Sequence, residues 1–114
     1  MSYDVSLHDP VTGNLCEMTE QVPAGGTYAL GDRRACEFNI TYNYAEVFGG
    51  LVRELAGRTT AEALPALEAF VNAHPTAKPY EADYWAPTIG NAKAAVEVLV
   101  SFSKAHPAGV WRVC

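Results

Sequence analysis

The hydrophobic period of this sequence changes once, near residue 42, and this change limits the possible folds more than any other feature. Before it, apolar residues alternate with polar residues, as at Tyr3, Val5 and Leu7. After it, apolar residues return every three or four positions, which is the spacing of one face of a helix. A chain that begins with strands and continues with helices is typical of an α+β fold.

The alternating part predicts an antiparallel sheet of about four to five strands. Turn-forming residues, mainly Pro, Gly, Asp and Asn, separate its segments. The predicted strands are residues 3–8, 15–22, 27–31 and 35–42, followed by a last strand at 109–114. Trp111 and Val113 share one side of the last strand, which we expect to rejoin the sheet.

Three helices are predicted, over residues 43–57, 59–74 and 89–105. Asn43 with Glu46, and Thr59 with Glu62, have the spacing of capping boxes at the first two helix starts. Thr88 is the expected N-cap of the third. We expect all three helices to pack on one face of the sheet, in a single domain that spans residues 1–114.

Two features inside the predicted helices conflict with regular helix geometry. Gly49 and Gly50 lie in the middle of the first helix, where each costs about 1 kcal/mol relative to alanine. The pair therefore predicts a bend or a close packing contact, and packing against a second copy would be one route to a dimer. Pro65 lies beyond the first turn of the second helix, which predicts either a kink or a later helix start.

Composition and charge narrow the class of protein. The 114 residues are 49% hydrophobic, and 13 acidic and 8 basic side chains give a net charge of −5. This predicts one domain whose core needs no metal or disulfide. No basic stripe is present, so we expect no direct nucleic-acid binding, and a basic protein surface or a small molecule is the expected partner. No apolar run reaches about 18 residues and the N-terminus lacks a signal-peptide pattern, so we expect a cytoplasmic protein without membrane contact.

The cysteines do not form a recognisable disulfide or zinc pattern. Cys16, Cys36 and Cys114 are odd in number and widely spaced. Cys16 and Cys36 could face each other across the sheet, where reduced thiols would be ordinary core residues.

The histidines and glycines also give no catalytic or cofactor motif. His8, His74 and His106 lack the spacing of metal ligands, and the last two suit helix C-termini. No nucleophile–base pair can be recognised in the sequence, so the chain is predicted not to be an enzyme. A Cys–His pair whose members are distant in sequence would not be detected in this way. The glycine-rich residues 24–31 fit neither a P-loop nor a dinucleotide motif, and a hairpin turn is favoured there over an anion-binding loop. No cofactor or metal is expected.

Two polar regions are the candidate binding surfaces. The first is the Asn39 and Thr41 side of the predicted strand 35–42, which carries amide and hydroxyl groups but no charge. The second is the linker 74–93, where aromatic side chains lie beside acidic ones and a helix start presents free amides near a lysine. The candidate residues are Asn39, Thr41, Tyr44, Tyr80, Glu81, Asp83, Tyr84, Trp85, Asn91 and Lys93.

Each region also has a purely structural interpretation. The polar strand face can simply be exposed to solvent, the linker aromatics can cover the open end of the core, and Thr88 can satisfy the free amides of the helix start. A small-molecule pocket would require four residues to converge on one cavity: Asn39, Thr41, Tyr84 and Asn91.

Four segments, in the same order, resemble a family of small, functionally uncharacterised proteins from phages, prophages and related mobile elements. They are "GGTYALG", "NITYNYAEVF", "DYWAPTIGNAKAA" and "HPAGVW". The resemblance spans most of the chain, although "GDRRACEF" is more charged than the family pattern. It implies no catalytic residues, and it implies a protein that acts stoichiometrically in the host cytoplasm by binding a host protein or sequestering a signal molecule.

The resulting hypothesis is a non-catalytic binding protein that acts on a host protein, for example as an inhibitor of a host defence system such as CRISPR interference. Small size, acidity and the absence of a legible catalytic motif agree with it. One alternative is a protein that binds or sequesters a small molecule or nucleotide. A second alternative is a small enzyme without a recognisable motif.

Overall fold

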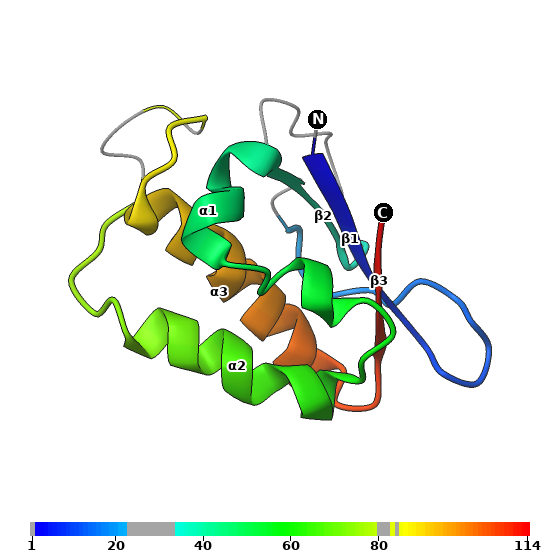
Figure 1. Ribbon diagram of the computed structural model, residues 1–114. Helices are drawn as coiled ribbons and strands as arrows, with labels where there is room; N and C mark the ends of the chain where they lie inside the picture. The colour runs from blue at the N-terminus through cyan, green and yellow to red at the C-terminus, as the bar shows by residue number, and fades with distance from the viewer. Residues whose placement is uncertain (1, 23–33, 80–82, 84) are drawn as a thin grey trace.

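A three-stranded antiparallel sheet forms one layer of the computed structural model, in the strand order β2-β1-β3 (Figure 1). β1 spans Ser2–His8, β2 spans Glu37–Thr41 and β3 spans Val110–Val113. The structure describes residues 2–22, 34–79, 83 and 85–114. Within them the α+β class is confirmed, and β3 rejoins the sheet beside β1 as predicted.

The sheet is smaller than predicted, because residues 15–22 do not form a strand. Leu15 and Glu17 make only isolated bridges, the first to His8 and the second to Ala35. These bridges go to two different segments, so the chain here crosses from the end of β1 to the residues before β2 instead of following one neighbour. The predicted strand at 27–31 lies outside the described residues.

The first predicted helix is wrong, because the chain forms three short pieces there. They are the 3₁₀ turn η1 at Tyr42–Tyr44, the helix α1 at Ala45–Phe48 and the 3₁₀ turn η2 at Arg53–Leu55. Gly49 ends α1 in the left-handed region at φ 59°, and Gly50 follows at φ 95°. Glycine reaches these angles without steric cost, so the pair terminates the helix rather than bending it.

The predicted N-cap at Asn43 is also wrong. Thr41 is the N-cap of η1, and its Oγ1 accepts a hydrogen bond from the Asn43 backbone N–H at 3.2 Å. The Asn43 side chain instead donates to the Trp85 carbonyl oxygen at 2.8 Å. This bond ties the linker before α3 to the junction between β2 and α1.

The two longer helices lie where their capping residues predict them. α2 spans Thr60–Asn72 and α3 spans Ile89–Ala105. Thr88 caps α3 by accepting from the Asn91 backbone N–H at 3.1 Å. α2 begins at Thr60 and continues through Pro65, so a later start is wrong. Proline costs the helix one backbone hydrogen bond there, to the carbonyl one turn earlier.

Replacing Thr59 with alanine is expected to destabilise the fold by about 1 kcal/mol, because Thr59 and Glu62 cap each other. Thr59 Oγ1 accepts from the Glu62 N–H at 3.2 Å, and Glu62 Oε1 accepts from the Thr59 N–H at 3.0 Å. The backbone N–H and then the hydroxyl of Thr59 lower the pKa of Glu62. This contribution is complete above the unfolded-state pKa of glutamate and is lost as the pH falls through the lowered pKa.

Urea denaturation at neutral and acidic pH measures both effects. Thr59→Ser keeps the hydroxyl and is the matched control, so it should retain most of the wild-type stability. If Thr59→Ala unfolds at the same urea concentration as the wild type at neutral pH, the capping box does not stabilise the fold.

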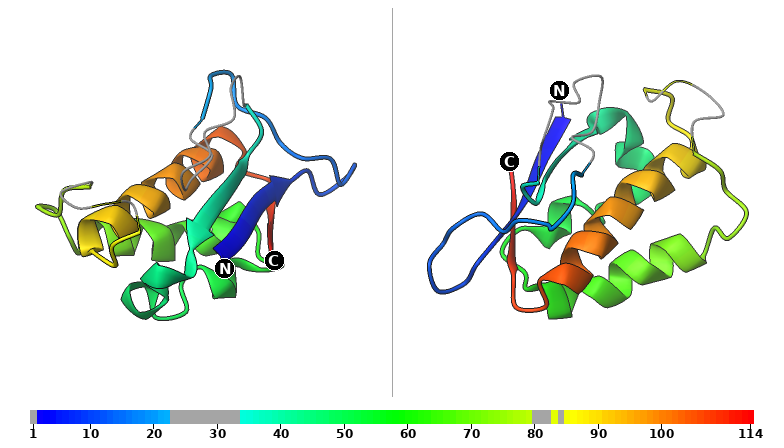
Figure 2. Two further views of the ribbon diagram at one scale, coloured as in Figure 1. Left: turned by 90° about the horizontal axis from the view of Figure 1, so that it is seen from above. Right: turned by 180° about the vertical axis from the view of Figure 1, so that it is seen from behind.

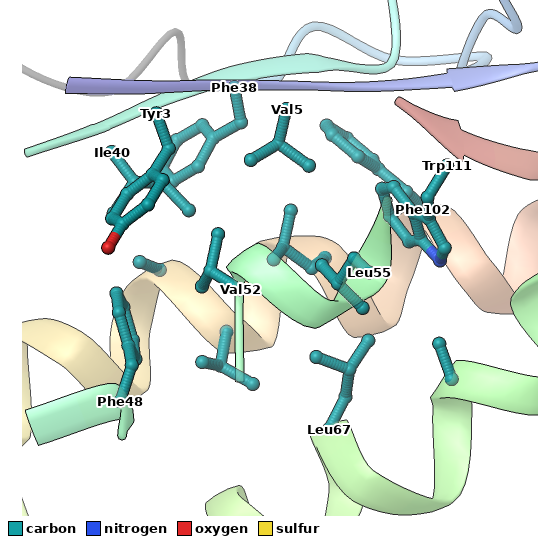
Figure 3. Close-up of a cluster of buried hydrophobic side chains, with 14 of the residues drawn as sticks. Tyr3, Val5, Phe38, Ile40, Phe48, Val52, Leu55, Leu67, Phe102 and Trp111 are labelled. Atoms are coloured by element: carbon teal, nitrogen blue, oxygen red, sulfur yellow. The ribbon is translucent and has the colours of Figure 1, made fainter. Parts of the chain in front are cut away.

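The hydrophobic core lies between the sheet and the helices (Figure 3). Figure 3 shows Val5, Phe38 and Ile40 pointing from the sheet toward the helices, and Trp111 entering the same cluster from β3. Both views in Figure 2 keep α2 and α3 on the same side of β1. One face of the sheet is therefore buried, and the strand residues of opposite parity point away from these helices.

Candidate functional site

The face of the sheet that points away from the helices is polar, and we call it the outer face. Its polar residues along the paired strands include Asp4, Ser6, His8, Glu37, Asn39 and Arg112, and the half-buried Val110 lies opposite His8 on the same side. Ser6 pairs with Glu37 on one side and with Arg112 on the other, while Asp4 pairs with Asn39. Directly opposed side chains on a sheet have Cβ atoms about 5 Å apart. An acid, a hydroxyl and a base therefore form one row across the three strands.

An open hollow of about 320 Å³ lies on the outer face where β1 meets β2. Its lining residues are Asp4, Val5, Ser6, Glu37, Phe38, Asn39 and Cys114. Asn39 Nδ2 donates to Ser2 Oγ at 2.6 Å and to Asp4 Oδ1 at 2.8 Å, which fixes the orientation of the Asp4 carboxylate. Two carboxylates, those of Asp4 and Glu37, thus border a concave site that is open to solvent.

Ser6 and His8 form a hydrogen-bonded pair beside this hollow. Ser6 Oγ lies 2.8 Å from His8 Nε2, and His8 Nδ1 lies 3.1 Å from the Gly13 carbonyl oxygen. Because a carbonyl oxygen only accepts, Nδ1 carries the ring proton and Nε2 accepts from the Ser6 hydroxyl. The Ser6 hydroxyl donates to the His8 imidazole, which in turn donates to the Gly13 carbonyl. This is the arrangement of nucleophile, base and orienting group that activates serine nucleophiles.

The turn at residues 9–14 positions the Gly13 carbonyl for this contact. The Asp9 N–H donates to the Asn14 carbonyl at 2.8 Å, and the Gly13 N–H donates to the Asp9 carbonyl at 2.9 Å. The backbone N–H groups of Thr12 and Val11 both donate to the Asp9 carboxylate and lower its pKa. Gly13 adopts a φ of 74°, which a residue with a Cβ rarely does.

Arg112 places a cation next to the Ser6–His8 pair. Its partner on β1 is Ser6, and its Nη2 would lie 3.9 Å from a Cβ at Gly13, so the guanidinium reaches toward the turn. The guanidinium makes no hydrogen bond or ion pair within the described part of the chain. It is therefore available to an anionic group of a ligand.

The residues predicted from the end of the strand at 35–42 have separate environments. Asn39 lies on the outer face and is held by Ser2 and Asp4. Thr41 is only 2% exposed at the end of β2, where its hydroxyl caps η1. Tyr44 is fully buried in the core and meets Phe48 edge to face.

The predicted linker residues hold the start of α3 in place. Asn91 is 2% exposed, and its Nδ2 donates to the carbonyl oxygens of Asp83 at 2.8 Å and Ala86 at 3.2 Å. Trp85 is 43% exposed, and its backbone carbonyl accepts from the Asn43 side chain. Lys93 is half-buried on α3.

The predicted convergence of Asn39, Thr41, Tyr84 and Asn91 on one cavity includes a residue that the structure does not describe. Tyr80, Glu81 and Tyr84 lie outside the described residues. Among the predicted residues that are described, Asn39 lines the hollow on the outer face, whereas Thr41 and Asn91 do not.

Sequence reasoning missed Ser6, His8, Glu37 and Arg112 as members of a common surface. A signal was available, because the alternation in residues 3–8 already puts Asp4, Ser6 and His8 on one side of a strand. The position of Arg112 beside Ser6 depends on the register of β3 against β1, and no local pattern specifies that register.

Comparison with protein-family models, with curated proteins and with solved structures finds no match to this chain. Across residues 2–22, 34–79, 83 and 85–114, no helix combines the length and apolarity needed to cross a membrane. In the same ranges, no three His, Cys, Asp or Glu side chains group so that they could hold a metal ion. Function must therefore be inferred from the chemistry of the outer face.

Proposed function

We propose that the protein is a non-catalytic binding protein that acts stoichiometrically on a protein partner, with the outer face as its contact surface. The open hollow bordered by Asp4 and Glu37 carries this proposal. A concave site with carboxylates at its rim suits the ammonium or guanidinium group of a lysine or arginine on the partner. Arg112 on the same face suits an acidic group next to that basic side chain.

The charge of the whole chain favours the same class of partner. A net charge of −5 steers basic surfaces toward the protein and repels acidic ones. The resemblance to phage and mobile-element proteins makes a host protein in the host cytoplasm the proposed partner, and a host defence protein such as a CRISPR effector is one example. Sequestration of a small molecule or nucleotide has less support, because Thr41 and Asn91 are each 2% exposed and serve as internal hydrogen-bonding residues.

Asp4→Lys is expected to weaken binding of a basic side chain in the hollow by at least about tenfold, because it reverses the charge at the rim. The probes are N-acetyl-arginine amide and N-acetyl-lysine amide, titrated into ¹⁵N-labelled protein. In the wild type, the backbone amide signals of β1 and β2 should shift. In the variant those shifts should be lost.

Glu97→Lys makes the same charge change at an exposed position of α3 and is the matched control. It should bind both probes as the wild type does. Equal shifts in Asp4→Lys, or shifts spread evenly over the surface, would reject the hollow as the binding site. In affinity purification, a true partner is retained by the wild type and Glu97→Lys but not by Asp4→Lys.

A second candidate function, hydrolysis of an ester, is supported by the Ser6–His8–Gly13 arrangement. Ser6 Oγ would attack the ester carbonyl carbon while His8 Nε2 takes the hydroxyl proton and passes it to the leaving alcohol. Water, activated by the same imidazole, would then release the acyl group from Ser6. The neighbouring Arg112 would stabilise the negative charge that develops on the carbonyl oxygen.

Ser6→Ala is expected to remove acetylation by p-nitrophenyl acetate, because it removes the attacking oxygen. Peptide mass spectrometry should find one acetyl group on Ser6 of the wild type and none in the variant. His8→Gln should slow the reaction by about 10²-fold or more. Ser101→Ala alters an exposed serine of α3 and serves as the control. The candidate would be ruled out if the wild type acquires no acetyl group on Ser6 and releases p-nitrophenolate no faster than Ser6→Ala.

A further inference from the structure

Cys16 and Cys36 lie directly opposite each other on two antiparallel segments. Glu17 bridges Ala35, so the register places Cys16 opposite Cys36, and the Cys36 N–H donates to the Cys16 carbonyl at 2.9 Å. The Cys16 N–H donates to the Leu7 carbonyl, so the two cysteines share one backbone hydrogen bond. Opposed residues of antiparallel segments have Cα atoms roughly 4.5–5.5 Å apart, within the range of roughly 4.4–6.8 Å that a disulfide spans. We propose that this pair is a site of oxidative modification, where a low-molecular-weight disulfide converts the two thiols into an intramolecular disulfide.

The two thiols share one environment but differ in access. Cys36 is fully buried, whereas Cys16 is half-buried and packs against the edge of the core. Burial, followed by the neighbouring Cys16 and Glu17, raises the pKa of the Cys36 thiol to about 12. Burial and then Asp9 also raise the pKa of Cys16. Both thiols are therefore protonated near neutral pH, and oxidation is slow there and faster in alkali.

Cys16 can be reached from solvent, which gives the reaction its starting point. It lines an open hollow of about 170 Å³ together with residues of the 9–10 turn and of the 105–109 segment. His106 Nε2 lies 2.7 Å from the Glu17 carbonyl oxygen and holds this part of the chain against the end of α3. The geometry makes Cys16 the attacking thiol and Cys36 the resolving thiol.

The proposed reaction is a thiol–disulfide exchange in two steps. The Cys16 thiolate attacks one sulfur of oxidised glutathione, forms a mixed disulfide and releases one glutathione thiolate. The Cys36 thiolate then attacks the Cys16 sulfur, forms the Cys16–Cys36 bond and releases the second glutathione thiolate. Two protein thiols are oxidised, one glutathione disulfide is reduced to two thiols, and the two protons go to the released thiolates.

Peptide mapping tests the proposal directly. The full chain is incubated with oxidised glutathione at pH 8.5, quenched in acid, alkylated and digested with trypsin. Cleavage after Arg33, Arg34, Arg53 and Arg112 puts each cysteine on a different peptide. We expect residues 1–33 linked to residues 35–53, with Cys114 alkylated or glutathionylated. The oxidised protein should also melt at a temperature higher by about 5–10 °C, because the cross-link restricts the unfolded chain.

Single variants separate the two steps. Cys36→Ser should stop at the mixed disulfide on Cys16, Cys16→Ser should leave Cys36 unmodified, and Cys114→Ser should form the cross-link as the wild type does. A wild-type end product with glutathione on Cys16, a cross-link that includes Cys114, or three unmodified thiols would each overturn the proposal. The wild-type peptide map decides the question even if a variant does not fold.

Discussion

Gly90→Ala is expected to destabilise the protein by about 3 kcal/mol, although alanine normally favours a helix over glycine by about 1 kcal/mol. Gly90 is buried in the first turn of α3. A Cβ at this position would overlap the carbonyl oxygen of Lys78 and lie 2.5 Å from its carbonyl carbon. Backbone atoms cannot rotate aside as the end of a long side chain can, so the linker or the helix must move.

The same movement would break the contacts that hold the linker. Asn91 follows Gly90 in the chain, and its side chain donates to the carbonyl oxygens of Asp83 and Ala86. The backbone amides in the first turns of α3 should therefore exchange their hydrogens faster in Gly90→Ala than in the wild type. Urea denaturation should show the lower free energy of unfolding.

Gly49→Ala is the matched control, because it places a Cβ on a residue with a positive φ where no neighbouring atom crowds that Cβ. Gly49 has a φ of 59°, and no atom lies within 4 Å of a Cβ placed there. It should cost only the left-handed strain, about 1–2 kcal/mol. If Gly90→Ala is as stable as the wild type, the approach of Lys78 to α3 is not as close as described.

The parts of the fold that could be predicted from the sequence depend on local chemistry. α2 and α3 begin beside Thr59 and Thr88 because a side-chain oxygen there accepts a nearby backbone N–H, and both partners lie within one turn. β1 could be predicted because its polar and apolar residues alternate without exception. In each case the deciding interaction involves neighbours in the chain.

The parts that could not be predicted depend on non-local register or on competition between local signals. Val52 and Leu55 are buried and keep a helical spacing, so the residues around Gly49 resemble one continuous helix although the chain breaks there. Residues 15–18 alternate like a strand but contact two different partners. Asn39 and Thr41 have the same parity, yet Thr41 is at the strand end and becomes a cap.

The outer face shows the same division at the level of function. The sequence places Asp4, Ser6 and His8 on one side of β1, and the structure keeps them there. The sequence alone does not reveal that Arg112 lies beside Ser6, because this position depends on the pairing of β1 with β3, a strand from the other end of the sequence. A candidate site formed by distant segments is therefore visible only once the sheet register is known.

Trp111→Ala is expected to cost about 3–5 kcal/mol, a large share of the stability of a domain of this size. Trp111 is fully buried and points from β3 into the core (Figure 3). Its Nε1–H finds no acceptor within the described residues. Trp111→Phe should therefore cost much less than the alanine variant, since the loss of ring volume is partly offset by removing a buried donor that lacks a partner.

Trp111→Ala should also disturb the outer face, because Trp111 precedes Arg112 in β3. The Trp111 backbone N–H donates to the Arg58 carbonyl and its carbonyl accepts from the Gly57 N–H, both at 2.9 Å, so the ring and the backbone together fix this strand. Trp85→Ala, at a side chain that is 43% exposed, is the matched control and should cost less than about 1 kcal/mol. Urea unfolding followed by circular dichroism measures all three variants without relying on tryptophan fluorescence. Equal losses for Trp111→Ala and Trp85→Ala would mean that the Trp111 ring does not anchor β3, and the position of Arg112 beside Ser6 would then need another cause.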